Sequence, residues 1–330
     1  MNLLDRSIKT VDRWQQRHRI PSFIYAVFKK FGDDQAGNLV ALLTYFAFVS
    51  TFPLLLAMTG ILGLVLKDHP ELQDRISASA LSEFPIIGTQ LSSQLGVSSL
   101  GHSTPALLVG IIGAVLGGRG LANMLQTTLN SVWNVPRFER PGFPWNYLRT
   151  FGLLALLGVS AVVSTVAATL TGVGQIFGVS GVPIKIFAFA LTIGLDTGLF
   201  LIAFRLAAAK VVSTQDLLVG AILSSVAWHI LLGFAGAIIA RYLKHAQAIA
   251  GFFGVVLGLL AWFGLQAMAT VFAMEVDVVR SRQLWPRSIT HSPLTIADKR
   301  FLESKVREEA RHSDLKITVE FTEAADSPPD

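Results

Sequence analysis

Three ionisable side chains lie inside long apolar stretches of this sequence: Arg119, Asp196 and His229. Moving a charge into hydrocarbon is costly, so such residues in a membrane helix often bind a substrate or ion, or pass a proton. The alternatives are structural. Asp196 can be a carboxyl kept neutral or bonded to a neighbouring helix for packing, and His229 a core histidine with its hydrogen bonds satisfied. Both interpretations stay open at this point.

Further polar residues follow Arg119 at helical spacing. Asn123 and Asn130 continue the same helix face, and Glu275 ends the last apolar stretch of the chain. Residues three and four apart share one side of a helix, so these side chains predict a polar vestibule at the inner end of the protein. Capping at the membrane interface explains each of them singly.

An ion pair between Arg119 and Asp196 is the most specific hypothesis. With a span ending near residue 124, Arg119 lies about 7 Å inside the inner boundary and Asp196 about 13 Å deep, at about 1.5 Å per residue. Helix side chains tilt toward the N-terminus, which directs Arg119 deeper into the membrane. Exchanging the two residues should restore what each neutral substitution removes.

The elements that must position these residues are membrane helices. Of the 330 residues 52% are apolar and only 15% are charged, whereas a soluble domain carries about 25% charged residues. A helix needs about 20 apolar residues to cross the hydrocarbon core, and the uncharged stretches are too long for barrel strands. We expect an all-α polytopic bundle of about six transmembrane helices, near residues 36–66, 104–124, 150–172, 186–204, 217–240 and 248–274.

The distribution of Lys and Arg gives the expected orientation. Basic residues crowd the N-terminal segment and the connections on the same side, which predicts that both termini are cytoplasmic. We expect an interfacial N-terminal segment at 1–34, a membrane domain at 35–276 and a tail at 277–330 with a short solvated helix and a disordered end. Residues 20–31, with four aromatics and two lysines, suit an anionic lipid surface; a plain helical entry to the first span is the alternative.

Other chemistry is not expected. The sequence has no cysteine, and its seven histidines lack the spacing of metal ligands. A phosphate-binding glycine loop, a nucleophile elbow and an aromatic-basic nucleic-acid surface are also missing from it. We therefore expect no catalytic residue, no cofactor, no metal, no nucleic-acid partner and no enzyme activity, while a homo-oligomer remains an open alternative.

Two features bear on motion. Pro53 lies within the first span, where it removes one backbone hydrogen bond and predicts a kink, with Ser50 and Thr51 nearby to bond the freed carbonyls. Small-residue pairs such as Gly113/Gly117 and Gly194/Gly198 predict close helix packing. A fixed kink and a moving hinge give the same sequence pattern.

Four segments resemble the YihY/BrkB family of bacterial inner-membrane proteins. DDQAGNLVALLTYFAFVSTFPLLL (33–56) is similar to its first span and GGRGLANMLQTTLNSVWNVP (117–136) to the exit of its second. LLVGAILSSVAWHI (217–230) and GFFGVVLGLLAWFGLQAMATVFAMEVD (251–277) look like its fifth and sixth spans. The sequence departs from the family pattern at Gly264, where a tyrosine is usual, and lacks a proline before the fifth span's glycine and alanine.

The resemblance implies a location in the bacterial inner membrane but no settled activity. The family has carried a ribonuclease label, a serum-resistance label and suggestions of envelope-lipid transport. RNA hydrolysis needs a metal cluster or an acid-base pair open to water, and the sequence offers neither. The sequence therefore favours a transporter or lipid translocase, with a non-transporting scaffold or envelope-integrity protein as the alternative and a membrane-tethered ribonuclease last.

Overall fold

The computed structural model describes residues 3–65, 71, 104–156, 159–160, 182–246, 251–290 and 293–321. Within these ranges the chain is helical and contains no strand. Residues 145–156 also form a helix, at the beginning of the expected third span. The helices are α1 (Leu3–Arg17), α2 (Arg19–Asp33), α3 (Ala36–Val65), α7 (Thr104–Val132), η1 (Arg137–Glu139), α9 (Val182–Ala207), α10 (Leu218–Ala246), α11 (Gly251–Ser281) and α12 (Ile296–Glu308).

Four described helices are long and apolar enough to cross a membrane: Ala36–Leu55, Phe189–Ala207, Leu218–Ala235 and Val256–Ser281. They coincide with the expected first, fourth, fifth and sixth spans, so the protein is a polytopic helical membrane protein. The expected second span lies on α7, which has 29 residues. Most of the expected third span lies outside the described residues.

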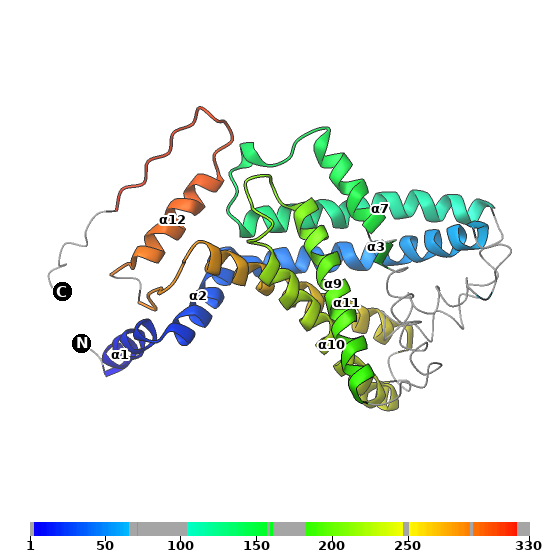
Figure 1. The fold of residues 1–330 in the computed structure, drawn as a ribbon, viewed down its shortest axis with the longest axis horizontal. Helices are drawn as coiled ribbons and strands as arrows, with labels where there is room; N and C mark the ends of the chain where they lie inside the picture. The colour runs from blue at the N-terminus through cyan, green and yellow to red at the C-terminus, as the bar shows by residue number, and fades with distance from the viewer. Residues whose placement is uncertain are drawn as a thin grey trace.

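The helices α3 and α7 lie side by side along much of their length (Figure 1). Glycines on α7 permit this approach, because a Cβ added at Gly113 would come within 2.9 Å of Pro53, and one at Gly117 within 3.2 Å of Ser50. The Gly113/Gly117 pair therefore packs as expected. An added Cβ at Gly194 or Gly198 would meet nothing within 4 Å, so the prediction of close packing at that pair is wrong for the described part of the chain.

Pro53 lies inside α3, as expected from the sequence. The hydroxyls of Ser50 and Thr51 donate to the carbonyls of Phe46 and Ala47, each four residues earlier. Proline at position 53 frees the carbonyl of residue 49 instead, so the expected role of these hydroxyls is wrong. Back-bonding of this kind often bends a helix, and the kink itself stays a prediction.

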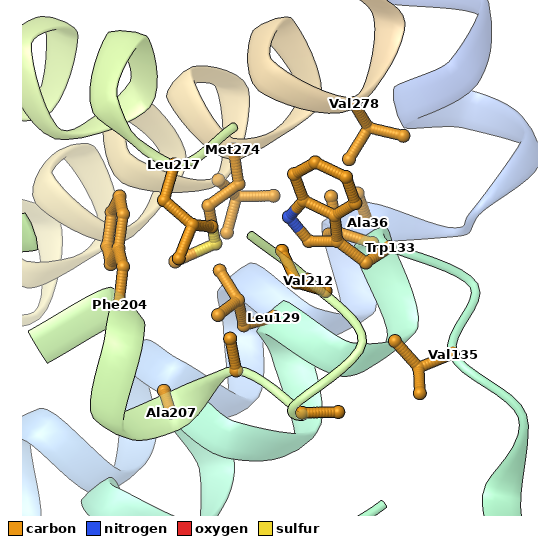
Figure 2. Packing of buried hydrophobic residues seen from close by; sticks show 14 of the residues in the cluster. Ala36, Leu129, Trp133, Val135, Phe204, Ala207, Val212, Leu217, Met274 and Val278 are labelled. Carbon is orange, nitrogen blue, oxygen red and sulfur yellow. The ribbon is translucent and has the colours of Figure 1, made fainter. Parts of the chain in front are cut away.

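A buried apolar core lies at the inner end of the bundle, which we define as the end near both termini (Figure 1). Figure 2 shows its packing. The core joins the end of α7, the end of α9, the beginning of α10 and the end of α11. Its side chains are almost completely removed from solvent, and they lie against one another from four different helices. They include Leu129, Trp133, Phe204, Leu217, Met274 and Val278.

The tail helix α12 is docked on the inner end rather than free in solvent. Phe301 is buried within the core of the inner end, and the buried side chains of Asp298 and Glu308 face other segments of the chain. The prediction of a short helix in the tail is confirmed, whereas the prediction that it is solvated is wrong. Ion pairs to buried partners, which are not visible in the tail sequence, hold it in place.

Candidate functional site

Asp196 and His229 form a hydrogen-bonded pair between α9 and α10. Asp196 Oδ2 lies 2.7 Å from His229 Nε2. Asp196 lies 11 residues before Ala207, where one span ends, and His229 lies 11 residues after Leu218, where the next begins. At about 1.5 Å per residue each lies about 16 Å from the inner end, near the middle of a core about 30 Å thick.

A second contact fixes the register of the two helices. Ser225 Oγ donates to the carbonyl of Ile193 at 3.1 Å. Ser225 lies one turn before His229, and Ile193 three residues before Asp196, so both contacts lie on the same pair of helix faces. The register therefore brings the imidazole and the carboxyl to the same depth.

The pair can share or exchange a proton. A neutral imidazole carries one N–H donor and one acceptor, and a carboxyl changes from acceptor to donor when it is protonated. The side chains are partly accessible, with 17% of Asp196 and 15% of His229 exposed, and the ring of Phe189 lies edge-on to the imidazole at 5.7 Å. The arrangement suits proton binding or contact with a polar group that enters between the helices.

Arg119 does not meet Asp196, so the predicted ion pair is wrong. The guanidinium donates to Tyr147 Oη at 2.9 Å and lies 4.8 Å from the centre of the same ring. Tyr147 belongs to the helix at 145–156, which packs beside α7. A phenol offers both a hydrogen bond and a cation–π contact near the interface, while Asp196 already has His229 as its partner.

The polar residues after Arg119 connect helix ends. The carboxamide of Asn123 accepts from Thr150 Oγ1 at 3.2 Å. Asn130 donates to the carbonyl of Ala207 at 3.2 Å and accepts from the amide of Ala209 at 2.9 Å. Asn130 therefore caps the C-terminal end of α9, where carbonyls lack partners within the helix. Neither residue contacts the Asp196–His229 pair.

Glu275 lies in a buried cluster of charges. The Lys30 ammonium is 2.9 Å from Glu275 Oε2, pairs with Asp34 and donates to the carbonyl of Val132 at 2.7 Å. The side chains of Lys30, Asp34 and Glu275 are all 0% exposed. We call Lys30, Asp34 and Glu275 the inner charge cluster. It joins α2, α7 and α11, so Glu275 supports structure and does not line an open vestibule.

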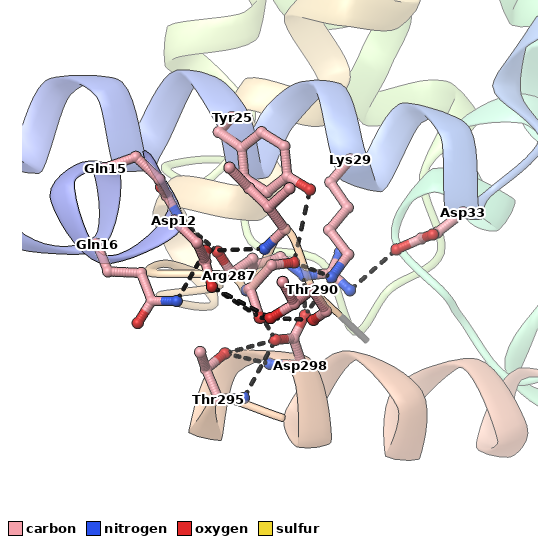
Figure 3. A network of polar contacts seen from close by, with 12 residues as sticks. Asp12, Gln15, Gln16, Tyr25, Lys29, Asp33, Arg287, Thr290, Thr295 and Asp298 are labelled. Atoms are coloured by element: carbon pink, nitrogen blue, oxygen red, sulfur yellow. Dashed lines mark hydrogen bonds and ion pairs between the residues drawn. The ribbon is translucent and has the colours of Figure 1, made fainter. Parts of the chain in front are cut away.

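A second polar network fastens the tail to the N-terminal helices (Figure 3). Arg287 lies 2.8 Å from Asp298 and 2.9 Å from Asp33, and Lys29 lies 2.9 Å from Asp298. Burial alone raises the pKa of Asp298, but hydrogen bonds from the Ser288 amide, Lys29 and further donors outweigh it and hold the pKa well below its usual range. Asp298 is therefore charged, and it binds α12 to α2.

In the described part of the chain, no group of three His, Cys, Asp or Glu side chains is placed to hold a metal ion.

The six candidate residues from the sequence take part in separate contacts. Only Asp196 and His229 contact each other, while Arg119, Asn123, Asn130 and Glu275 have different partners.

Comparison with known proteins gives the family. A family model described as "Virulence factor BrkB" matches residues 27–293, well over half of the chain. The chain belongs to the BrkB family. It is also 23% identical over 282 residues to "Inner membrane protein YhjD" of Escherichia coli (strain K12), an alignment covering 81% of this chain and 83% of that protein. No solved structure matches.

This BrkB-family chain is thus a multi-pass protein of the inner membrane. The matched range contains the Asp196–His229 pair and the whole inner charge cluster, whereas α12 lies after it. The partners that α12 contributes, Asp298 among them, come from outside the family match.

Sequence reasoning missed several buried charges at the inner end. Lys30 and Asp34 are four residues apart, a spacing that signals a helical ion pair, but their place in a basic N-terminal segment suggested a surface. Asp277 was also missed: its Oδ1 accepts from the amide of Gly220 at 2.7 Å, in the first turn of α10. The available signal is an acid at the end of the last apolar stretch, within α11, where it can reach the N-terminus of a neighbouring helix.

Proposed function

We propose that this BrkB-family protein is a transporter of the inner membrane, with an envelope lipid as the first substrate class to test. The observation that carries the proposal is the Asp196–His229 hydrogen bond near mid-depth between α9 and α10. Ionisable groups at that depth cost free energy and are candidates for function by default, and both side chains stay partly exposed.

Six membrane helices with both ends in the cytoplasm are part of this proposal. Four apolar spans, the length of α7 and the helix that begins at residue 145 support the number. The packing of α12 against α2 and its neighbours supports placing the two ends on one side, as an even number of crossings requires.

The mechanism follows from the hydrogen bond. Protonation of the pair changes which atom donates between α9 and α10, and loss of the bond leaves two polar groups to find new partners. A polar headgroup or a proton passing between the helices supplies such a partner. Binding and release at the pair then change the contact between the two helices.

Reconstitution in liposomes tests this function. Wild-type protein should move a fluorescent phospholipid, or a proton followed with an internal dye, faster than empty liposomes. Asp196→Asn and His229→Gln should each abolish the movement. Arg137→Ala, an exposed change at the inner end, is the matched control and should move substrate like wild type. No movement by wild type across a panel of lipids would reject the proposal.

A non-transporting scaffold is the second candidate, favoured by the sealed state of Glu275. The predicted vestibule residue is 0% exposed and paired with Lys30, which suits a rigid assembly. If the protein is a scaffold, Asp196→Asn should change neither the movement of lipid or protons in liposomes nor the integrity of the cell envelope. Hydrolysis of RNA is the least supported function: the described residues hold no group of three side chains placed to bind a metal ion, and the exposed His312–Asp314 contact lies in the tail after α12.

The N-terminal helix α2 is proposed to contact anionic lipid. It exposes one apolar row, Ile20, Ile24 and Phe28, at 73%, 50% and 60%. Phe28 also packs edge-on against Phe272 of the α11 span at 5.2 Å, so this row begins at the membrane. Apolar side chains flanked by lysine and arginine suit the headgroup region.

A further inference from the structure

Two arginines converge on one loop at the inner end, and neither pairs with a carboxylate of the described residues. Arg149, on the helix at 145–156, donates to the carbonyl of Ala208 at 2.6 Å. Arg205, near the end of α9, donates to the carbonyls of Ala209 at 3.4 Å and Val212 at 2.9 Å. Carbonyls of residues 208–212 in the α9–α10 loop therefore hold both guanidiniums, and each guanidinium retains further N–H donors.

The surrounding sequence does not neutralise these charges. From residue 140 to residue 215 the only acidic residue is Asp196, which is bound to His229 at mid-depth. The next acid, Asp216, accepts from Ser213 and Ser281. Arg149 and Arg205 thus have no ion-pair partner among the described residues, in contrast to the paired cations of the inner charge cluster.

A third cation and an aromatic side chain lie beside the arginines. Lys210 is exposed, and its ammonium lies 5.9 Å from the centre of the Trp145 ring. Trp145 is 61% exposed, and its neighbours Phe143, Leu148 and Phe151 are 85%, 63% and 55% exposed. Exposed aromatics next to a membrane helix are typical of the headgroup level of a bilayer.

We propose that Arg149, Arg205 and Lys210, beside Trp145, bind the phosphate of an anionic phospholipid headgroup in the leaflet nearest the termini. A guanidinium donates two parallel N–H bonds to phosphate oxygens. The loop carbonyls hold both arginines before the ligand arrives, which reduces the entropy cost of binding. The exposed apolar neighbours favour a lipid over free phosphate, because they would lie against its acyl chains.

The site is independent of the transport proposal. It lies at the membrane surface, where Arg205 is nine residues, about 14 Å of helix, from Asp196, and a lipid held there does not need to move. A protein that transports nothing would still bind anionic lipid at these residues, so the two proposals can fail separately.

Native mass spectrometry of the purified full-length protein tests the site. Detergent-solubilised protein is titrated with phosphatidylglycerol, with phosphatidylcholine and with inorganic phosphate. Wild type should retain phosphatidylglycerol preferentially, and Lys210→Gln should weaken that binding about fivefold, the effect of one cation at a membrane surface. The Arg149→Gln/Arg205→Gln double variant should lose the preference for the anionic lipid.

The matched control removes the same charge elsewhere. Arg300→Gln/Arg307→Gln lies on the exposed side of α12 and should bind phosphatidylglycerol like wild type. Equal loss in the control and the site variants would overturn the proposal, as would unchanged binding in the double variant or displacement of the lipid by inorganic phosphate. The exposed Lys210→Gln variant decides the outcome if the double variant does not fold.

Discussion

The ionisable side chains of the inner charge cluster differ in burial and in number of partners from those of the Asp196–His229 pair, which we call the mid-membrane pair. Lys30 is 0% exposed and has two carboxylates and a backbone carbonyl as partners. Asp196 and His229 rely on each other for the contact that crosses between their helices and stay partly exposed. A sealed group with several partners serves to hold helices together, whereas an accessible pair with one shared bond is free to change its state.

The largest effect is expected from breaking the inner charge cluster. Lys30→Met leaves Glu275 buried without its cation, while Asp34 keeps Lys305 at 3.0 Å. Removing one partner of a buried ion pair costs about 3–5 kcal/mol, so thermal unfolding in detergent should occur at a much lower temperature. Lys9→Met, on exposed α1, is the control and should unfold like wild type. Equal unfolding temperatures for wild type, Lys30→Met and Lys9→Met would show that the cluster does not stabilise the protein.

The tail network should give the next largest effect. Asp298→Asn removes the carboxylate that binds Arg287 and Lys29. Arg287 keeps its ion pair with Asp33, and Lys29 keeps its hydrogen bond to the carbonyl of Ser288. Hydrogen bonds to charged groups contribute about 1.5–3 kcal/mol. Hydrogen exchange should show faster opening of α12 in the variant, with unchanged exchange in α9 and α10. Faster exchange throughout the bundle would show that α12 is not a separate unit.

The pH dependence of this network has a defined sign. Because the pKa of Asp298 is lowered in the folded protein, its contribution is fully present above the unfolded value of about 3.9. It is lost only as the pH falls through the lower folded value. Docking of wild-type α12 should therefore be the same at pH 7 and pH 5, as hydrogen exchange corrected for intrinsic rates can check. Release of α12 between these values would contradict the assignment.

Glycine substitutions compare the packing at the inner end of the bundle with the packing near the mid-membrane pair. An added Cβ at Gly220 would lie 2.8 Å from Asp277 Cγ and 2.9 Å from the Ala273 carbonyl, whereas one at Gly194 would meet nothing within 4 Å. Overpacking costs about 1–3 kcal/mol. Gly220→Ala should lower the unfolding temperature, and Gly194→Ala on α9 should leave it unchanged or raise it slightly. The reverse order would contradict the packing of α10 against α11.

The smallest effect is expected at the surface of the tail. Arg137 pairs with Glu309 at 3.1 Å, but both side chains are about half exposed or more, at 49% and 62%. Exposed ion pairs contribute little, because water and salt screen them. Arg137→Ala should leave both the unfolding temperature and the exchange of α12 unchanged. A loss comparable to that of Asp298→Asn would show that the outer contact holds the tail.

The membrane helices could be predicted from the sequence because long uncharged stretches have few alternatives. The partners of Arg119 and Asp196 could not, because pairing depends on how each helix is rotated about its axis. The aromatic segment that supplies Tyr147 lies outside the long apolar tracts. The sequence thus predicts how deep a residue lies along its helix, but not which residue of the neighbouring helix it contacts.

The inner charge cluster was unpredictable for a different reason. Lys30 and Asp34 precede Gln35, which has a φ of 52° and turns the chain from α2 into α3. That turn places α2 against the end of α11, where Glu275 lies. Contacts between residues so far apart in sequence require the three-dimensional arrangement, so a basic segment that suggested a surface is partly buried.

The most direct test of the account compares stability and flux in the same variants. Asp196→Asn and His229→Gln should unfold within a few degrees of wild type and yet fail to move labelled lipid or protons in liposomes. Lys30→Met supplies the opposite case, a protein that is less stable because its structure is weakened. If Asp196→Asn transports like wild type, or loses stability as Lys30→Met does, the functional assignment of the mid-membrane pair is wrong.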